Sequence, residues 1–346
     1  MRIDEGRIRP LAGWTAVAAT GPYLTLKALW LTGHPVGSDD PGAMDRLWLV
    51  NLLTVGMDAV AVALALAFVR PWGRRAPAGL VLFPMWVATG LLGTVLVALP
   101  LYLLSIPLLG PEPSTGQEAA GGLGDWVFAV VYGGFAVQGL ALITAFVLYA
   151  RRRWAGLLRA RTGDLPRSPT LTVQRVLACV AALLGLGTAA ARAYWAAGGT
   201  AGLPAGSVQD RSRGVAVMDA VTAAMAVAAS AGLLVLVFRI LPRRPLRTPL
   251  LVVWTAAGSL FGWGCWQLVA FGATATGTTG PMALVQAAQV VTAVLVLAVG
   301  AVALVERAAA ARGPVVESPG WTRGAAGFGG RERCCSGGAP GCAGCT

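Results

Sequence analysis

Long apolar stretches alternate with short polar segments along this chain, and most of the charged residues lie in the polar segments. Each apolar stretch has about 20 residues or more, enough to cross roughly 30 Å of hydrocarbon at about 1.5 Å per helical residue. The pattern predicts an all-α, polytopic membrane helix bundle with eight transmembrane helices. The predicted spans cover about residues 11–33, 47–69, 79–103, 126–150, 171–196, 214–238, 249–271 and 282–305.

Composition supports the membrane class. The chain has 346 residues, of which 56% are hydrophobic and only 12% are charged. A soluble globular domain needs a larger polar surface and would rarely have this composition.

The formal net charge of +12 is distributed by segment. Arginines gather beside every second loop, as in 151–153 and 243–244, whereas acids such as Asp39 and Asp40 lie in the alternate loops. By the positive-inside rule, both termini are expected to be cytoplasmic. The basic segments are then loop edges that contact anionic membrane lipids, and they do not indicate a nucleic-acid partner.

The two halves of the chain share short motifs in the same order. Each motif is weak alone, but their common order across four consecutive spans predicts an internal duplication. The matched segments are 27–30 with 192–195, 57–60 with 218–221, Trp86-x3-Gly90 with Trp254-x3-Gly258, and Val137-Gln138 with Val285-Gln286.

A unit with an even number of spans inserts both of its copies the same way up. The expected domains are therefore two parallel four-helix repeats, 1–165 and 166–305. The remaining residues, 306–346, lack apolar periodicity and are expected to form a disordered cytoplasmic tail.

Four charged residues fall well inside the predicted spans, at corresponding places in the two halves: Lys27, Asp58, Arg192 and Asp219. A charge at mid-span costs about 2.5–3.5 kcal/mol on insertion scales. We therefore expect Lys27 to pair with Asp58, and Arg192 to pair with Asp219.

Two interpretations of these charges remain open. Buried ion pairs can simply fix the positions of helices. Intramembrane ionisable residues can also mark an ion or substrate pathway, here a candidate polar site completed by Gln138 and Gln286. Gly21-Pro22 in the first span and Gly185 with Gly187 in the fifth predict a kink or break before each cation, as in the discontinuous helices of transporters.

Cysteines in the tail are the weak candidates for a metal site: Cys334, Cys335, Cys342 and Cys345. Structural zinc sites usually have two Cys-x2-Cys pairs on an ordered scaffold, and this tail offers one pair among Gly, Ser and Ala. An incidental extension is the favoured interpretation, so we expect no cofactor.

Motifs for enzymatic chemistry are absent from the sequence. It has one histidine, no His-Glu-x-x-His motif and no phosphate-binding Gly-x4-Gly-Lys-[Ser/Thr] loop. It also lacks a recognisable Ser or Cys nucleophile with an adjacent base. An enzyme is the least favoured class.

The segment Gly21-Pro22-Tyr23-Leu24-x2-Lys27-x2-Trp30 resembles the first span of uncharacterised multi-pass integral membrane proteins of high-GC actinobacteria. The resemblance implies a location in the bacterial inner membrane and implies no activity.

The sequence thus favours a transporter-like membrane protein that moves or binds a small solute or lipid between the two repeats. The alternative is a structural or accessory membrane subunit, in which the charges only hold helices together. A deep polar cavity between the halves would favour the first hypothesis, and a tightly packed bundle the second.

Overall fold

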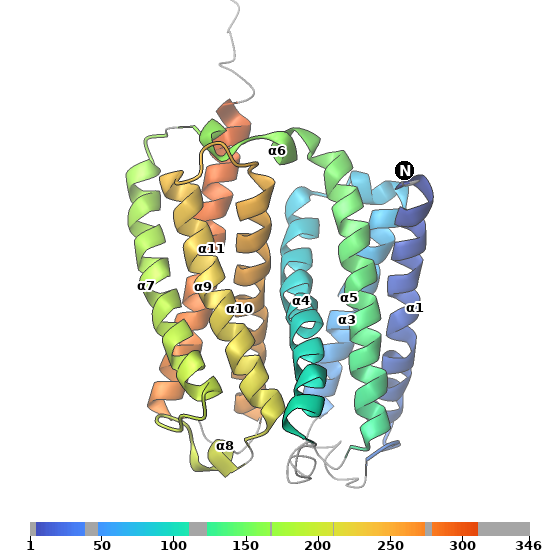
Figure 1. Ribbon diagram of the computed structural model, residues 1–346. Coiled ribbons are helices and arrows are strands. Elements are labelled where there is room, and N and C mark those ends of the chain that lie inside the picture. Colours follow the sequence, from blue (N-terminus) through green and yellow to red (C-terminus); the bar gives the residue numbers. More distant parts are fainter. Residues whose placement is uncertain are drawn as a thin grey trace, which may run out of the picture.

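The computed structural model describes residues 5–38, 48–110, 123–166, 168–209, 211–273 and 279–310, and these residues form an all-α bundle (Figure 1). All eight predicted stretches are helical, with ends that differ from the predicted ones by a few residues. The long helices are α1 (Glu5–Leu31), α3 (Trp48–Val69), α4 (Ala78–Leu109), α5 (Asp125–Arg153), α7 (Leu171–Ala196), α9 (Arg213–Phe238), α10 (Arg247–Ala273) and α11 (Gly280–Ala310). Short helices lie between them: the 3₁₀ turns η1 (Pro71–Arg74) and η4 (Thr162–Asp164), α6 (Ala155–Arg159) and α8 (Ala205–Gln209).

Seven of these long helices are apolar and long enough to cross a membrane, which confirms a multi-pass helical membrane protein. They are α3, α4, α5, α7, α9, α10 and α11. The sequence predicts eight spans, and α1 does not belong to this set. Its apolar stretch is diluted by Thr15, Thr20, Pro22, Thr25 and Lys27.

Neither α1 nor α7 is broken at the predicted positions. Helix α1 continues through Pro22, and α7 continues through Gly185 and Gly187. Gly185 serves close packing instead, because a Cβ at this position would meet the Ser230 hydroxyl of α9. Small residues commonly allow membrane helices to approach each other in this way.

The helices form two groups that stand side by side in Figure 1. In the first group, α1 packs against α3 and α5, and α4 packs against α5. In the second group, α7 packs against α9 and α11, and α10 packs against α9 and α11. Each group has its own apolar core, around Leu142 in the first and around Leu233 in the second.

Helices α4 and α10 join the two groups at a close crossing. A Cβ on Gly90 would meet the backbone of Gly258, and a Cβ on Gly258 would meet the Trp86 carbonyl. One turn further along α4, the Thr94 and Ser259 hydroxyls share a hydrogen bond of 2.6 Å. Small residues, one hydroxyl pair and the tilted rings of Trp86 and Phe261, with centroids 5.0 Å apart, therefore line this crossing, and it holds none of the four intramembrane charges.

Gly90→Ala should lower the free energy of unfolding by about 1–3 kcal/mol, because the added methyl group overlaps the α10 backbone. The matched control is Gly133→Ala on α5, where the new Cβ meets nothing within 4 Å. Thermal unfolding of the purified protein in detergent measures both. Equal melting temperatures for the two variants would mean that α4 and α10 do not approach this closely.

Candidate functional site

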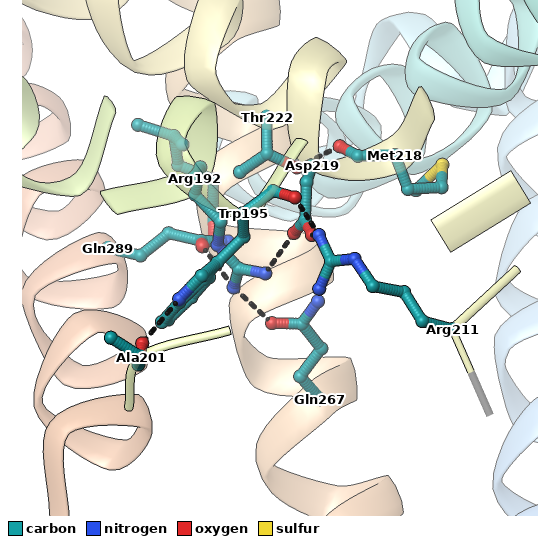
Figure 2. Close-up of polar contacts among 10 residues, drawn as sticks. Arg192, Trp195, Ala201, Arg211, Met218, Asp219, Thr222, Gln267 and Gln289 are labelled. Atoms are coloured by element: carbon teal, nitrogen blue, oxygen red, sulfur yellow. Dashed lines mark hydrogen bonds and ion pairs between the residues drawn. The ribbon is translucent and has the colours of Figure 1, made fainter. Parts of the chain in front are cut away.

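The buried charges of the second group form a polar centre near the α8 end of the bundle (Figure 2). We call Arg192, Arg211, Asp219, Gln267 and Gln289 the second centre. Arg192 lies one turn before the end of α7 and is 3% exposed. Its Nη1 donates to Asp219 Oδ1 at 2.9 Å, so the predicted ion pair between these residues is confirmed.

Two glutamines also accept hydrogen bonds from Arg192, although its Nε has no partner among the described residues. Its Nη2 donates to Gln267 Oε1 of α10 at 2.6 Å and to Gln289 Oε1 of α11 at 3.0 Å. The Gln289 amide in turn donates to the Leu260 carbonyl at 3.0 Å. The guanidinium thus connects all four helices of this group, as expected for a planar donor that forms several bonds at once.

A second arginine reaches the same carboxylate from the segment before α9. Arg211 Nη2 lies 3.5 Å from Asp219 Oδ2 and also donates to the Trp195 carbonyl (Figure 2). Both carboxylate oxygens of Asp219 therefore have cationic partners. Arg211 was not predicted as a site residue because it lies in a loop, and a loop arginine carries no sign that it folds back into the bundle.

The first group contains a comparable centre, made of Lys27, Asn51, Asp58 and Gln138, which we call the first centre. Lys27 Nζ donates to Asn51 Oδ1 at 2.6 Å. It also lies 4.9 Å from the centroids of both the Tyr23 and Trp30 rings. Cation–π attraction stabilises a desolvated ammonium group at such distances.

Asp58 does not pair directly with Lys27, so the predicted contact between them is wrong. Lys27 is close enough for its charge to act on Asp58, but among the described residues Asn51 is the partner of its ammonium group. The Gln138 side chain hydrogen-bonds the Asp58 carboxylate. Asn51 was not predicted as a site residue, because a single amide in an apolar span usually forms an ordinary interhelical hydrogen bond.

Two polar atoms of the first centre have no partner among the described residues: Asp58 Oδ2 and Asn51 Nδ2. Both side chains are deeply buried, at 5% and 3% exposure. A buried polar atom without a hydrogen bond costs about 1–3 kcal/mol, and more when the group is charged. The first centre is thus incompletely paired, whereas the Asp219 carboxylate in the second centre is paired on both oxygens.

Gln286, which the sequence placed in the same candidate site, is fully buried on α11. Neither its amide nitrogen nor its amide oxygen has a partner among the described residues. The structure therefore assigns Gln289, three residues further on, to the contact with Arg192.

No other candidate group forms a site within the described part of the chain. No cluster of three potential metal ligands occurs among the described residues, and the four tail cysteines lie outside them. A pocket at the α6 end of the second group is lined mainly by apolar side chains such as Leu233 and Val299. Its acid, Glu306, already accepts hydrogen bonds from Thr170 and Gln174.

Arg192→Gln and Asp219→Asn should each destabilise the protein by about 3–5 kcal/mol, because each leaves a buried charge with fewer partners. The double variant should lose less than the sum, with a coupling energy of about 0.5–3 kcal/mol. The matched cycle of Lys27→Gln with Asp58→Asn should give a smaller coupling energy, because these side chains do not touch. Equal coupling in the two cycles, measured by denaturant unfolding, would contradict this difference.

The geometry of the two centres carries the functional argument for this chain. No protein-family model, curated protein or solved structure matches it. What the chain does is therefore inferred from which buried polar groups are paired and which are not.

Proposed function

We propose that this chain is a transporter-like membrane protein, built from two parallel four-helix repeats, that binds a small polar solute at the first centre. The observation that carries the proposal is the pair of buried, unpartnered atoms Asp58 Oδ2 and Asn51 Nδ2. Intramembrane ionisable groups are costly, and a group whose pairing is incomplete is a candidate for ligand binding.

The duplication is supported by contacts that recur at matching positions. Trp30 Nε1 donates to the Val36 carbonyl, and Trp195 Nε1 donates to the Ala201 carbonyl, six residues on in both cases. Equivalent pairs of helices also pack together within each group: α1 contacts α3 and α5 in the first, and α7 contacts α9 and α11 in the second.

The crossing of α4 and α10 supports a parallel arrangement of the repeats. Gly90 and Gly258 are equivalent positions in the proposed repeats, and they contact each other. Contact between equivalent residues is what a two-fold axis through the crossing produces, and α4 and α10 both begin at the α6 end of the bundle (Figure 1), so this axis runs along the helices. Because such an axis relates α1 to α7, we propose α1 as an eighth span.

The location that we propose is the bacterial inner membrane, with both termini in the cytoplasm. The arginines of 151–153 and 243–244 lie at the end of the bundle where the chain begins and where α11 ends (Figure 1). The positive-inside rule assigns that end to the cytoplasm. Lipids that surround the spans are then the first partners of the protein.

The alternative function is a structural or accessory subunit. It is favoured by the second centre, where Asp219 is fully paired, and by the close crossing of α4 and α10. A deep polar cavity between the halves would have favoured the first hypothesis, but the four charges lie within the separate groups. We therefore propose the first group itself as the place of binding.

Eight spans predict that residues 1 and 310 lie on the same side of the membrane, whereas seven spans predict opposite sides. Reporter fusions at the N-terminus and after Ala310 should therefore both report the cytoplasm. A fusion in α8, between α7 and α9, serves as the control for the opposite side. Opposite reports from the two ends would exclude α1 as a span.

A solute that binds the first centre should raise the melting temperature of the purified protein, because binding to the native state stabilises it by about 2.7 kcal/mol at 100 times Kd. We expect Asp58→Asn to abolish this shift. The control is Asp164→Asn, which removes an exposed carboxylate from the connection between α6 and α7. If no member of a library of small polar solutes gives a shift that depends on Asp58, the result contradicts solute binding at the first centre and supports the structural alternative.

A further inference from the structure

The two centres differ in what neutralises the second oxygen of the carboxylate. In the second centre, Asp219 Oδ2 lies 3.5 Å from Arg211, an arginine of the chain itself. In the first centre, the equivalent atom, Asp58 Oδ2, has no partner among the described residues. The residue eight positions before Asp58, at the same sequence spacing as Arg211 from Asp219, is the uncharged Val50; it lies inside α3, whereas Arg211 precedes α9.

The second acceptor of Arg211 also has an equivalent in the first group. Arg211 donates to the carbonyl of Trp195, the residue near the end of α7 whose ring lies against Arg192. The equivalent carbonyl belongs to Trp30 near the end of α1, and both carbonyls accept a turn hydrogen bond from the residue three positions on, at 3.2 Å from Gly33 and 3.0 Å from Gly198. The backbone that receives Arg211 is therefore built in the same way in both groups.

Charge balance allows one further cation in the first centre. The second centre holds two guanidinium groups and one carboxylate, whereas the described part of the first holds one ammonium group and one carboxylate. Lys27 is already satisfied by Asn51 and two aromatic rings, so it leaves the Asp58 oxygen unneutralised. A cation there would give both centres the same net charge.

We infer that the ligand of the first centre is a small organic cation with a guanidinium group, bound where Arg211 is bound in the second centre. The inference rests on the proposed function and names the substrate class of that same site. A guanidinium group carries several N–H donors in one plane. It can therefore donate to a carboxylate oxygen and to a backbone carbonyl at the same time. In the second group, Arg211 occupies the equivalent position and closes it.

The test compares guanidinium with urea, which has nearly the same shape and no charge, both far below denaturing concentrations. Guanidinium should raise the melting temperature of the wild type with increasing concentration, and urea should not. The rise should disappear in Asp58→Asn and persist in Asp164→Asn. Potassium at equal ionic strength controls for salt.

Arg211→Ala supplies the second arm, because it gives the second centre the same unpartnered oxygen. This variant should be less stable than the wild type, and guanidinium should restore part of the loss where urea does not. If the variant does not fold, Arg211→Lys replaces it, since lysine keeps the charge and loses the fork. Absence of any guanidinium effect in both arms overturns the inference.

Two outcomes separate this inference from the proposed function. A neutral or anionic solute that stabilises the protein through Asp58 would leave the proposed function standing and overturn the guanidinium class. Guanidinium that acts only in Arg46→Ala would mean that the chain supplies its own cation to Asp58, which also overturns the inference. Arg46 lies outside the described residues.

Discussion

The cost of charge in a medium without water governs this structure. Lys27, Asp58, Arg192 and Asp219 are each at most 6% exposed, in helices that are otherwise made of alanine, leucine and valine. A buried charge is tolerated only when partners replace its hydration shell. The helices of each group therefore take up positions that bring amides, aromatic rings or opposite charges to these four residues.

The two centres meet this cost in different ways. In the second, two guanidinium groups hold one carboxylate, and amides from α10 and α11 accept two further hydrogen bonds from Arg192, which leaves only its Nε without a partner among the described residues. In the first, an ammonium group uses one amide and two aromatic rings, and part of the carboxylate is left without a protein partner among the described residues. Arginine offers five donors in a fixed plane and lysine offers a single compact charge, so replacing one with the other changes what each centre can bind.

Packing between the two groups follows a separate rule. Lipid chains are as apolar as leucine, so membrane helices associate through close contact of small residues and through interhelical hydrogen bonds. Gly90, Gly258 and the pair of Thr94 with Ser259 provide both at the crossing of α4 and α10. Close packing and one hydroxyl pair thus join the groups, while buried charges and amides organise the interior of each group.

The sequence by itself determined the helical membrane class, the positions of the helices and the ion pair of Arg192 with Asp219. Hydrophobic length is a local property, and a lone charge in an apolar span has few partners to choose from. The sequence did not reveal the role of Asn51 beside Lys27, the return of Arg211 from a loop, or the continuity of α1 through Pro22. Only the tertiary structure decided these, because they depend on which side chains other helices and loops bring within hydrogen-bonding distance, and residue spacing along one helix carries no record of that.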